Sequence, residues 1–151
     1  MKKRRRSLRP RVLFNASVIL AGIKSPKGGS ARALRFAKEE KIKGIISEII
    51  FDETLKHADK LNLSKDKVSQ RCLRIFKGVI LAPAEKKVRK YQRVVVDEGD
   101  CHVLASGEES GASFLVTLDK KHLLILKGKI KRFKIVTPGE MIKQLRYGKD
   151  S

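Results

Sequence analysis

The sequence predicts an α/β fold in which helices cover the faces of a mostly parallel sheet. Short apolar runs of strand length alternate along the chain with segments whose apolar residues recur every three or four positions. The chain has 151 residues, of which 41% are hydrophobic, and it shows no internal repeat and no clear linker. These features predict one domain at residues 12–147, with a basic arm at residues 1–11 and a short tail at residues 148–151.

The first half of the chain alternates two strands with helices. Residues 12–14 form an apolar run that stops at small polar residues, which predicts a buried strand that turns into a helix. A loop rich in Gly, Ser and Pro precedes a predicted helix at residues 30–41, which its initial serine is expected to cap. Residues 44–46 form the second predicted strand, and Ser47 and Ser64 are expected to cap two further helices.

The second half begins with two β-rich runs, at residues 79–81 and 94–96, which a charged stretch separates. Both runs are predicted as strands or extended segments. The acidic turn at residues 97–100 is expected to open a helix of small and apolar residues. The run SFLVT at residues 113–117 has the composition of a buried strand.

The last part of the chain predicts a short helix, a strand and a terminal helix. Residues 120–127 are expected to be helical, and residues 135–136 are expected to form the last strand. Thr137 is a candidate N-cap, and Pro138 suits the first helical position because an N–H group has no intrahelical partner there. This alternation is the order that builds a parallel sheet with helices on its faces.

The chain is strongly basic. Lys and Arg number 36 against 16 acidic residues, which gives a formal net charge of +20. A charge of this size attracts polyanions, of which nucleic acid is the commonest, and a soluble protein that is simply Lys-rich is the alternative. The basic arm is either a solubilising tail or a source of RNA contacts, with the candidates Lys2, Lys3, Arg4, Arg5 and Arg6.

The cysteine content favours a reducing compartment. Cys72 and Cys101 lie far apart and form neither a disulfide framework nor a zinc motif. We therefore expect reduced thiols in an intracellular, cytoplasmic protein. No apolar run reaches the roughly 18 residues that span a bilayer, so no membrane partner is expected. The basic N-terminus also lacks the long apolar stretch of a secretory signal.

Four polar residues fall at strand ends or in the first turns of the helices that follow: Asn15, Glu53, Asp100 and Asp119. In a parallel α/β sheet, sites form beyond the carboxyl ends of the strands, so these side chains can converge on one edge. Carboxylates clustered in one cleft repel each other unless a cation binds them, and such oxygen ligands suit Mg²⁺ or Mn²⁺. An ion of this kind activates water for attack on a phosphodiester.

The sequence around these residues resembles the motifs of the PIN domain family. The run VLFNASVILAGI resembles the opening strand and helix, and ISEIIFDE resembles the second motif, with Glu53 at the acidic position. The run DEGDCHVLASGEESGASFLVTLDKKHLL resembles the third and fourth motifs. Asp100 and Asp119 match their acidic positions there, and Thr117 matches the hydroxyl residue near the metal. The run KIVTPGEMIKQL resembles the closing strand and helix, so the resemblance covers nearly the whole domain.

The resemblance implies a Rossmann-like three-layer α/β/α sandwich and an Mg²⁺- or Mn²⁺-dependent endoribonuclease that acts on single-stranded RNA. It also implies frequent homodimerisation, and many small PIN proteins are the toxin of a toxin–antitoxin pair, with an acidic antitoxin as the partner. The chain departs from the family pattern at two positions, because the first Asp falls at Asn15 and the nearby Asn falls at Ser17. A neutral amide offers a metal only one carbonyl oxygen. We therefore expect reduced activity, and a catalytically degenerate module that binds RNA or a ribonucleoprotein is the alternative.

Each candidate ligand also has a simpler interpretation. Glu53 fits a solvent-facing helix position, Asp100 fits a helix cap, and Asp119 fits a turn. Asp97 is an alternative to Asp100 as a ligand. The ordered set of sequence blocks favours a site over these separate interpretations.

The basic and histidine residues near the predicted site are less specific. Lys120 and Lys121 are candidates for RNA contact, and a solvated helix turn explains them equally well. The sequence favours surface or helix positions, and not metal ligands, for His57, His102 and His122, because no second His or Cys lies at metal-ligand spacing.

Overall fold

A five-stranded sheet with all strands parallel forms the centre of the fold. The structure is a computed structural model that describes residues 9–77 and 79–147. The strand order is β3-β2-β1-β4-β5. The strands are β1 (Arg11–Phe14), β2 (Lys43–Ser47), β3 (Val79–Ile80), β4 (Phe114–Val116) and β5 (Lys134–Val136). On the central strand, Leu13 pairs with Ile45 of β2 and with Leu115 of β4.

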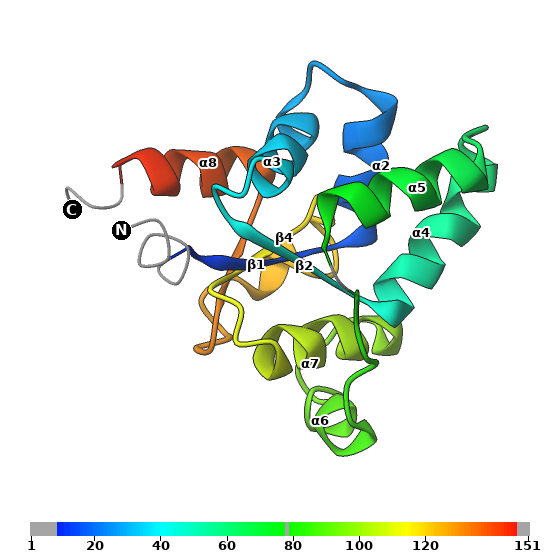
Figure 1. The fold of residues 1–151 in the computed structure, drawn as a ribbon. Coiled ribbons are helices and arrows are strands. Elements are labelled where there is room, and N and C mark those ends of the chain that lie inside the picture. The colour runs from blue at the N-terminus through cyan, green and yellow to red at the C-terminus, as the bar shows by residue number, and fades with distance from the viewer. Residues whose placement is uncertain (1–8, 78, 148–151) are drawn as a thin grey trace.

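Helices connect the strands and cover both faces of the sheet. The α-helices of the described residues are α2 (Ala16–Lys24), α3 (Gly29–Lys38), α4 (Glu48–Lys60), α5 (Lys65–Ile75), α6 (Glu85–Lys90), α7 (Cys101–Glu109) and α8 (Pro138–Tyr147). Two short 3-10 helices are η1 (Glu98–Asp100) and η2 (Leu124–Leu126). Figure 1 shows α2, α3, α5 and α8 on one face of the sheet, with α6 and α7 on the other. This arrangement confirms the predicted three-layer α/β/α sandwich.

The core lies between the sheet and the helices on each side. Val12, Leu13 and Phe14 are fully buried, because helices cover both faces of the central strand. This burial explains why the strand is a continuous apolar run that does not alternate with polar residues. The Phe14 ring meets the edge of Phe76, with the ring centroids 5.1 Å apart.

The two cysteines lie in the core as free thiols. Burial raises the pKa of Cys72 to about 11, and burial is also the main cause that raises the pKa of Cys101. Both thiols are therefore protonated at neutral pH, and neither has the character of a nucleophile.

Side-chain caps begin several helices where the sequence predicts them. Ser47 Oγ accepts a hydrogen bond from Ile50 N at 3.1 Å at the start of α4, and Ser64 caps α5 in the same way. At the start of α8, Glu140 N donates to Thr137 Oγ1 at 3.1 Å, and Thr137 N donates to Glu140 Oε1 at 2.9 Å. This reciprocal pair is a capping box, so Thr137 has its predicted role.

Helix α3 differs from its prediction at both ends. Its N-cap is Gly28, and Ser30 lies buried inside the first turn. The helix ends at Lys38 and not near residue 41, because Glu40 adopts a positive φ of 60° that stops the helix before β2.

Two predicted elements after β3 are wrong. Residues 94–96 form a turn and a bend, because Val94 N and Val95 N both donate to Tyr91 O. These local bonds override the strand preference of valine. Residues 120–127 form turns and η2, with no α-helix. The charged connector predicted before the first of these segments contains α6.

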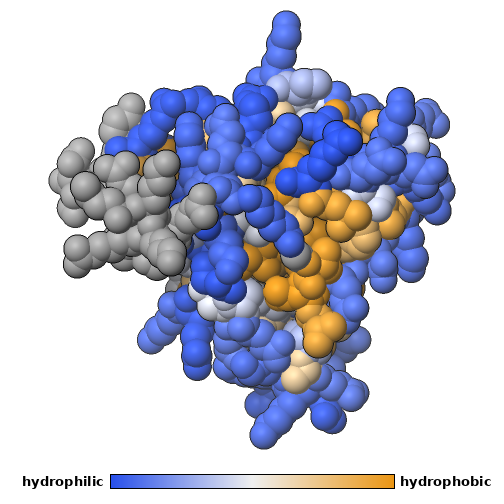
Figure 2. Space-filling model, viewed as in Figure 1, coloured by the Kyte–Doolittle hydropathy of each residue, from blue (hydrophilic) through white to orange (hydrophobic). Residues whose placement is uncertain are grey.

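The face of the molecule in Figure 2 is mainly hydrophilic, with an apolar area over the position of β2 and β3 in Figure 1. Leu81 follows β3 directly and is 78% exposed. A cavity of about 390 Å³ lies at the β2–β3 edge. Its lining combines apolar side chains such as Ile45 and Ile80 with basic ones such as Lys43 and Lys77.

Parts of the predicted basic arm and the whole predicted tail lie outside the described residues. The tail is residues 148–151, and the arm residues concerned include Lys2, Lys3, Arg4, Arg5 and Arg6. Within residues 9–77 and 79–147, no helix combines the length and the apolar character that crossing a membrane requires.

Candidate metal centre

The order of the strands reverses between β1 and β4. From β1 the chain builds outward through β2 to β3, and then returns to the other side of β1 to add β4 and β5. Ligand sites in open α/β sheets form at such a switch point, beyond the carboxyl ends of the strands. Asn15 follows β1 directly, and Asp119 lies three residues after the end of β4. Asn15 N donates a hydrogen bond to Val116 O at 3.0 Å, which fixes the two strand ends side by side.

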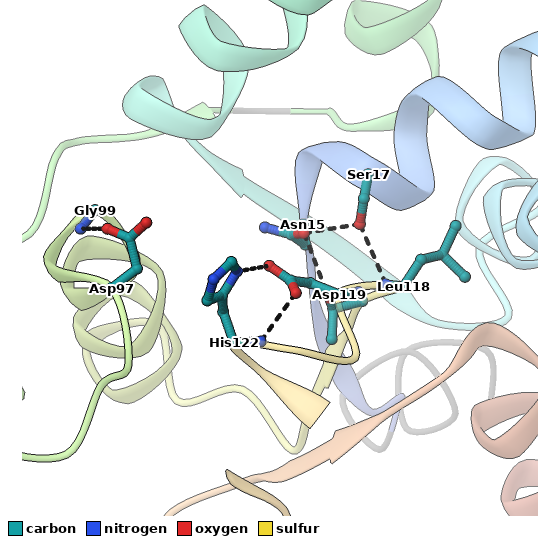
Figure 3. Close-up of polar contacts among 8 residues, drawn as sticks. Asn15, Ser17, Asp97, Gly99, Leu118, Asp119 and His122 are labelled. Atoms are coloured by element: carbon teal, nitrogen blue, oxygen red, sulfur yellow. Dashed lines mark hydrogen bonds and ion pairs between the residues drawn. The ribbon is translucent and has the colours of Figure 1, made fainter. Parts of the chain in front are cut away.

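The side chain of Asn15 joins these strand ends through two hydroxyl groups (Figure 3). Its Oδ1 atom accepts hydrogen bonds from Ser17 Oγ at 2.8 Å and from Thr117 Oγ1 at 3.0 Å. Ser17 Oγ in turn accepts a bond from Leu118 N at 3.2 Å. Thr117 Oγ1 accepts one from Asp119 N at 3.1 Å. The network therefore holds the loop that carries Asp119 against the end of β1.

These bonds occupy the oxygen that the sequence suggests as a weak metal ligand. An amide carbonyl has two lone pairs, and the two hydroxyl groups use both. Asn15 is 8% exposed and Thr117 is fully buried, so water has little access to this network. A metal can bind Asn15 Oδ1 only after one of the two bonds breaks. Ser17 and Thr117, predicted as supporting residues, are the residues that hold Asn15 in place.

Asp119 and His122 form a second local motif (Figure 3). Asp119 Oδ1 accepts a hydrogen bond from His122 N at 3.0 Å, and Asp119 Oδ2 lies 3.1 Å from His122 Nδ1. The carboxylate thus stabilises the turn that follows it and also orients the imidazole. The side chains of Asp119 and His122 remain 29% and 37% exposed, so both can contact a ligand.

Asp100 approaches from the junction of η1 and α7. It stands at the N-cap position of α7, but its side chain makes no capping hydrogen bond. Asp97 has a capping role instead, because its Oδ1 accepts a hydrogen bond from Gly99 N at 2.9 Å. In Figure 3, this Asp97–Gly99 pair lies apart from Asp119 and His122. The interpretation of Asp100 as no more than a cap therefore has no support in the structure.

Within the described part of the chain, Asp100, Asp119 and His122 form the one group of three or more His, Cys, Asp or Glu side chains close enough to share a metal ion. One ligand atom from each residue lies within 4.8 Å of the other two. Burial raises the pKa of Asp100, and the charges of Asp119 and Asp97 raise it further. The nearby His122 and His102 act in the opposite direction. The carboxylates therefore repel each other, and a bound divalent cation would relieve this repulsion.

Glu53 lies outside this group and pairs with a histidine. Glu53 Oε1, on α4, is 2.8 Å from His102 Nε2, on α7. The side chain of His102 is 11% exposed, and its Nδ1 atom is buried with no hydrogen-bond partner among the described residues. Glu53 thus connects α4 to the first turn of α7, two residues from Asp100. The simpler interpretation of Glu53, as a helix residue that faces solvent, does not account for this contact with His102.

The donor set fits a divalent cation. Two carboxylates supply the charge that balances such an ion, and carboxylate and imidazole groups both bind first-row transition metals. Lys120 and Lys121 are exposed in the turn after Asp119, where they add positive charge beside the site. Their contact with RNA remains a prediction, as does that of the basic arm.

The fold and this cluster define the class of protein. A family model described as PIN domain matches residues 11–121, from β1 to the turn after β4. Since this match covers most of the chain, the protein belongs to the PIN domain family, whose members are generally nucleases and typically use divalent metals. The match includes the four residues predicted from the sequence, whereas His122 lies immediately beyond it. A comparison with curated proteins found no match.

The sequence does not predict a site role for His102 or His122. The only available signal is spacing, because His102 lies two residues after Asp100 and His122 lies three residues after Asp119. A spacing of three residues brings side chains together in a helical turn. Many surface pairs have the same spacing, so the sequence alone does not distinguish this pair from them.

Proposed function

We propose that the protein is an endoribonuclease that cuts single-stranded RNA and depends on Mg²⁺ or Mn²⁺. The observation that carries this proposal is the group of Asp100, Asp119 and His122 at the switch point of a PIN-family sheet. A divalent cation bound there supplies an activated water and stabilises the charge that develops on the phosphate. The net charge of +20 attracts the RNA backbone, and Lys120 and Lys121 bind phosphates beside the cluster.

The residues of the site have two kinds of role: two carboxylates bind the cation, and two further side chains keep these carboxylates in place. Asp100 and Asp119 would hold the cation through carboxylate oxygens. Asn15 keeps the Asp119 loop against β1 through the two hydroxyl groups on its Oδ1 atom. Glu53 holds α7, and with it Asp100, through its contact with His102. Each of these residues therefore affects the distance between the two carboxylates.

The test is the cleavage of a labelled single-stranded RNA in Mn²⁺, in Mg²⁺ and in EDTA. We expect cleavage with the ions and none in EDTA. Asp119→Asn removes a charged ligand and should lower the rate about hundredfold or more, because the contribution of a metal ion is several kcal/mol. Asp66→Asn, at an exposed position in the first turn of α5, is the matched control and should cleave normally. Cleavage that persists in EDTA would contradict the proposal.

A second candidate function is RNA binding without turnover, and the hydrogen bonds of Asn15 favour it. With Oδ1 engaged by two hydroxyl groups, the site presents fewer oxygen ligands than a set of four carboxylates. This function predicts RNA affinity that falls steeply as salt rises, with no cleavage under any condition. Removal of residues 1–8 should then weaken binding if the arm contacts RNA. Affinity that does not respond to salt would argue against this function.

We also propose an acidic protein partner, as in a toxin–antitoxin pair, in a cytoplasmic setting, with a homodimer as the other possible assembly. The cavity at the β2–β3 edge has apolar side chains and Lys43 in its lining and lies beside the exposed Leu81, so it suits an acidic segment with apolar side chains. Lys77, which also lines it, is already paired with Glu40. An acidic chain that copurifies with the native protein, and is lost with Leu81→Asp, is the expected result. Copurification that survives this substitution would place the partner elsewhere.

A further inference from the structure

We propose that His122 is a direct ligand of the metal ion and takes the coordination place that Asn15 does not fill. The site is then composed of two carboxylates and one imidazole. We further infer that this set favours Mn²⁺ and Co²⁺ over Mg²⁺. The inference rests on the proposed metal-dependent function and adds a residue and an ion preference to it.

The first step of the argument is geometric. The ligand atoms of Asp100, Asp119 and His122 lie within 4.8 Å of one another. Two ligands about 2.1 Å from the same ion lie at most about 4.2 Å apart. The cluster therefore needs to contract only slightly to enclose an ion. The His122 backbone N–H donates to Asp119 Oδ1 at 3.0 Å, and the imidazole is held beside the carboxylate by the 3.1 Å contact between Nδ1 and Asp119 Oδ2.

The second step concerns the other possible ligands. Asn15 Oδ1 accepts two hydrogen bonds from hydroxyl groups. The Glu53 carboxylate is 2.8 Å from His102. Glu53 does not belong to the group of carboxylate and imidazole ligand atoms that lie together, whereas His122 does. The imidazole is thus the third donor that the structure offers to an ion.

The third step concerns the choice of ion. Imidazole nitrogen binds first-row transition metals well, and affinity rises from Mn²⁺ to Co²⁺. Mg²⁺ keeps several of its waters and is usually held by one or two carboxylates. Loss of the imidazole should therefore weaken the binding of Mn²⁺ and Co²⁺ much more than that of Mg²⁺. If His122 only positioned Asp119, its loss would weaken the binding of all three ions in parallel.

The experiment is calorimetric titration of Mg²⁺, Mn²⁺ and Co²⁺ into the native protein, His122→Ala and the control His57→Ala. His57 is an exposed residue of α4 outside the cluster. We expect His122→Ala to lose roughly tenfold or more in affinity for Mn²⁺ and Co²⁺, with a clearly smaller change for Mg²⁺. His57→Ala should bind all three ions as the native protein does. His122→Asp should shift the preference toward Mg²⁺.

A second measurement uses the native protein and does not depend on the folding of a variant. In the Co²⁺-loaded protein, a coordinated imidazole gives a carbon-bound ring-proton resonance with a large paramagnetic shift. Its absence, or a parallel loss of affinity for all ions in His122→Ala, would overturn the role of His122 while leaving the proposed function intact. If the native protein binds none of the three ions, the inference and the proposed function both fail.

Discussion

Replacement of Asn15 by alanine removes the acceptor that joins β1 to the Asp119 loop. Two hydroxyl donors lose their partner, Ser17 Oγ at 2.8 Å and Thr117 Oγ1 at 3.0 Å. Thr117 is fully buried, so its orphaned hydroxyl costs about 1–3 kcal/mol. Ser17 is partly exposed and its hydroxyl can turn toward water, so its loss costs about 0.5–1.5 kcal/mol. The expected fall in the free energy of unfolding is therefore about 1.5–4.5 kcal/mol.

Urea unfolding in EDTA, followed by circular dichroism, measures this quantity. Asn15→Asp is the matched variant, because a carboxylate has nearly the same shape and still accepts both hydroxyl bonds. In EDTA we expect it to be less stable than the native protein, because it adds a largely buried negative charge near Asp119 and Asp100, and Mn²⁺ should then stabilise it more than it stabilises the native protein. A change of less than about 0.5 kcal/mol for Asn15→Ala would refute the role of the network.

Three further predictions concern α7, which carries Asp100 at its start. Glu108→Gln should lower the free energy of unfolding by about 1.5–3 kcal/mol in chemical denaturation, because it removes charged hydrogen bonds with Lys90, at 2.6 Å, and with Tyr91. The control is Glu109→Gln, at an exposed position whose carboxylate accepts one hydrogen bond from a backbone N–H. This control should change the free energy of unfolding by less than about 0.5 kcal/mol. The Lys90 hydrogen bond holds the pKa of Glu108 below its ordinary 4.5. The stability that ionised Glu108 contributes is therefore present above pH 4.5 and is lost as the pH falls through the lowered pKa. Acid titration of the native protein should show a loss of stability in that pH range, and Glu108→Gln should not show it. Gly107→Ala should lower the free energy of unfolding by about 1–3 kcal/mol, because the added Cβ would lie 2.8 Å from the Phe133 ring. Thermal unfolding measures this change. An unchanged melting temperature would show that the ring moves aside freely.

The periodicity of the sequence predicts most of the fold because it reflects local burial. Strands β1 and β4 are mainly apolar runs buried between the helix layers, and Ser47 and Thr137 carry the side chains that begin helices. Residues 94–96 have the same β-branched composition, but hydrogen bonds to a preceding carbonyl hold them in a turn. Composition describes the preference of a segment, and the hydrogen bonds around it decide whether that preference is realised.

The sequence predicts only those parts of the candidate site that follow from the order of the strands in the sheet. Asn15 and Asp119 meet because parallel neighbouring strands end at one edge, a consequence that follows from the order of elements. The engagement of Asn15 Oδ1 depends on Thr117, which is 102 positions away in the chain. His122 turns toward Asp119 because the segment predicted as a helix is a turn. Such details arise from the three-dimensional arrangement of the side chains, which spacing along the sequence does not reveal.

The separation of Asn15 and Thr117 also has a consequence for protein synthesis. Translation produces β1 early, but the residues that complete the cluster all lie at or after Asp100. The hydrogen bond that spans 102 positions cannot form until β4 has left the ribosome. A nascent chain therefore has no complete site until Asp119 and His122 have emerged. If the protein cuts RNA as proposed, a chain still being translated cannot cut the messenger that encodes it until these residues have emerged.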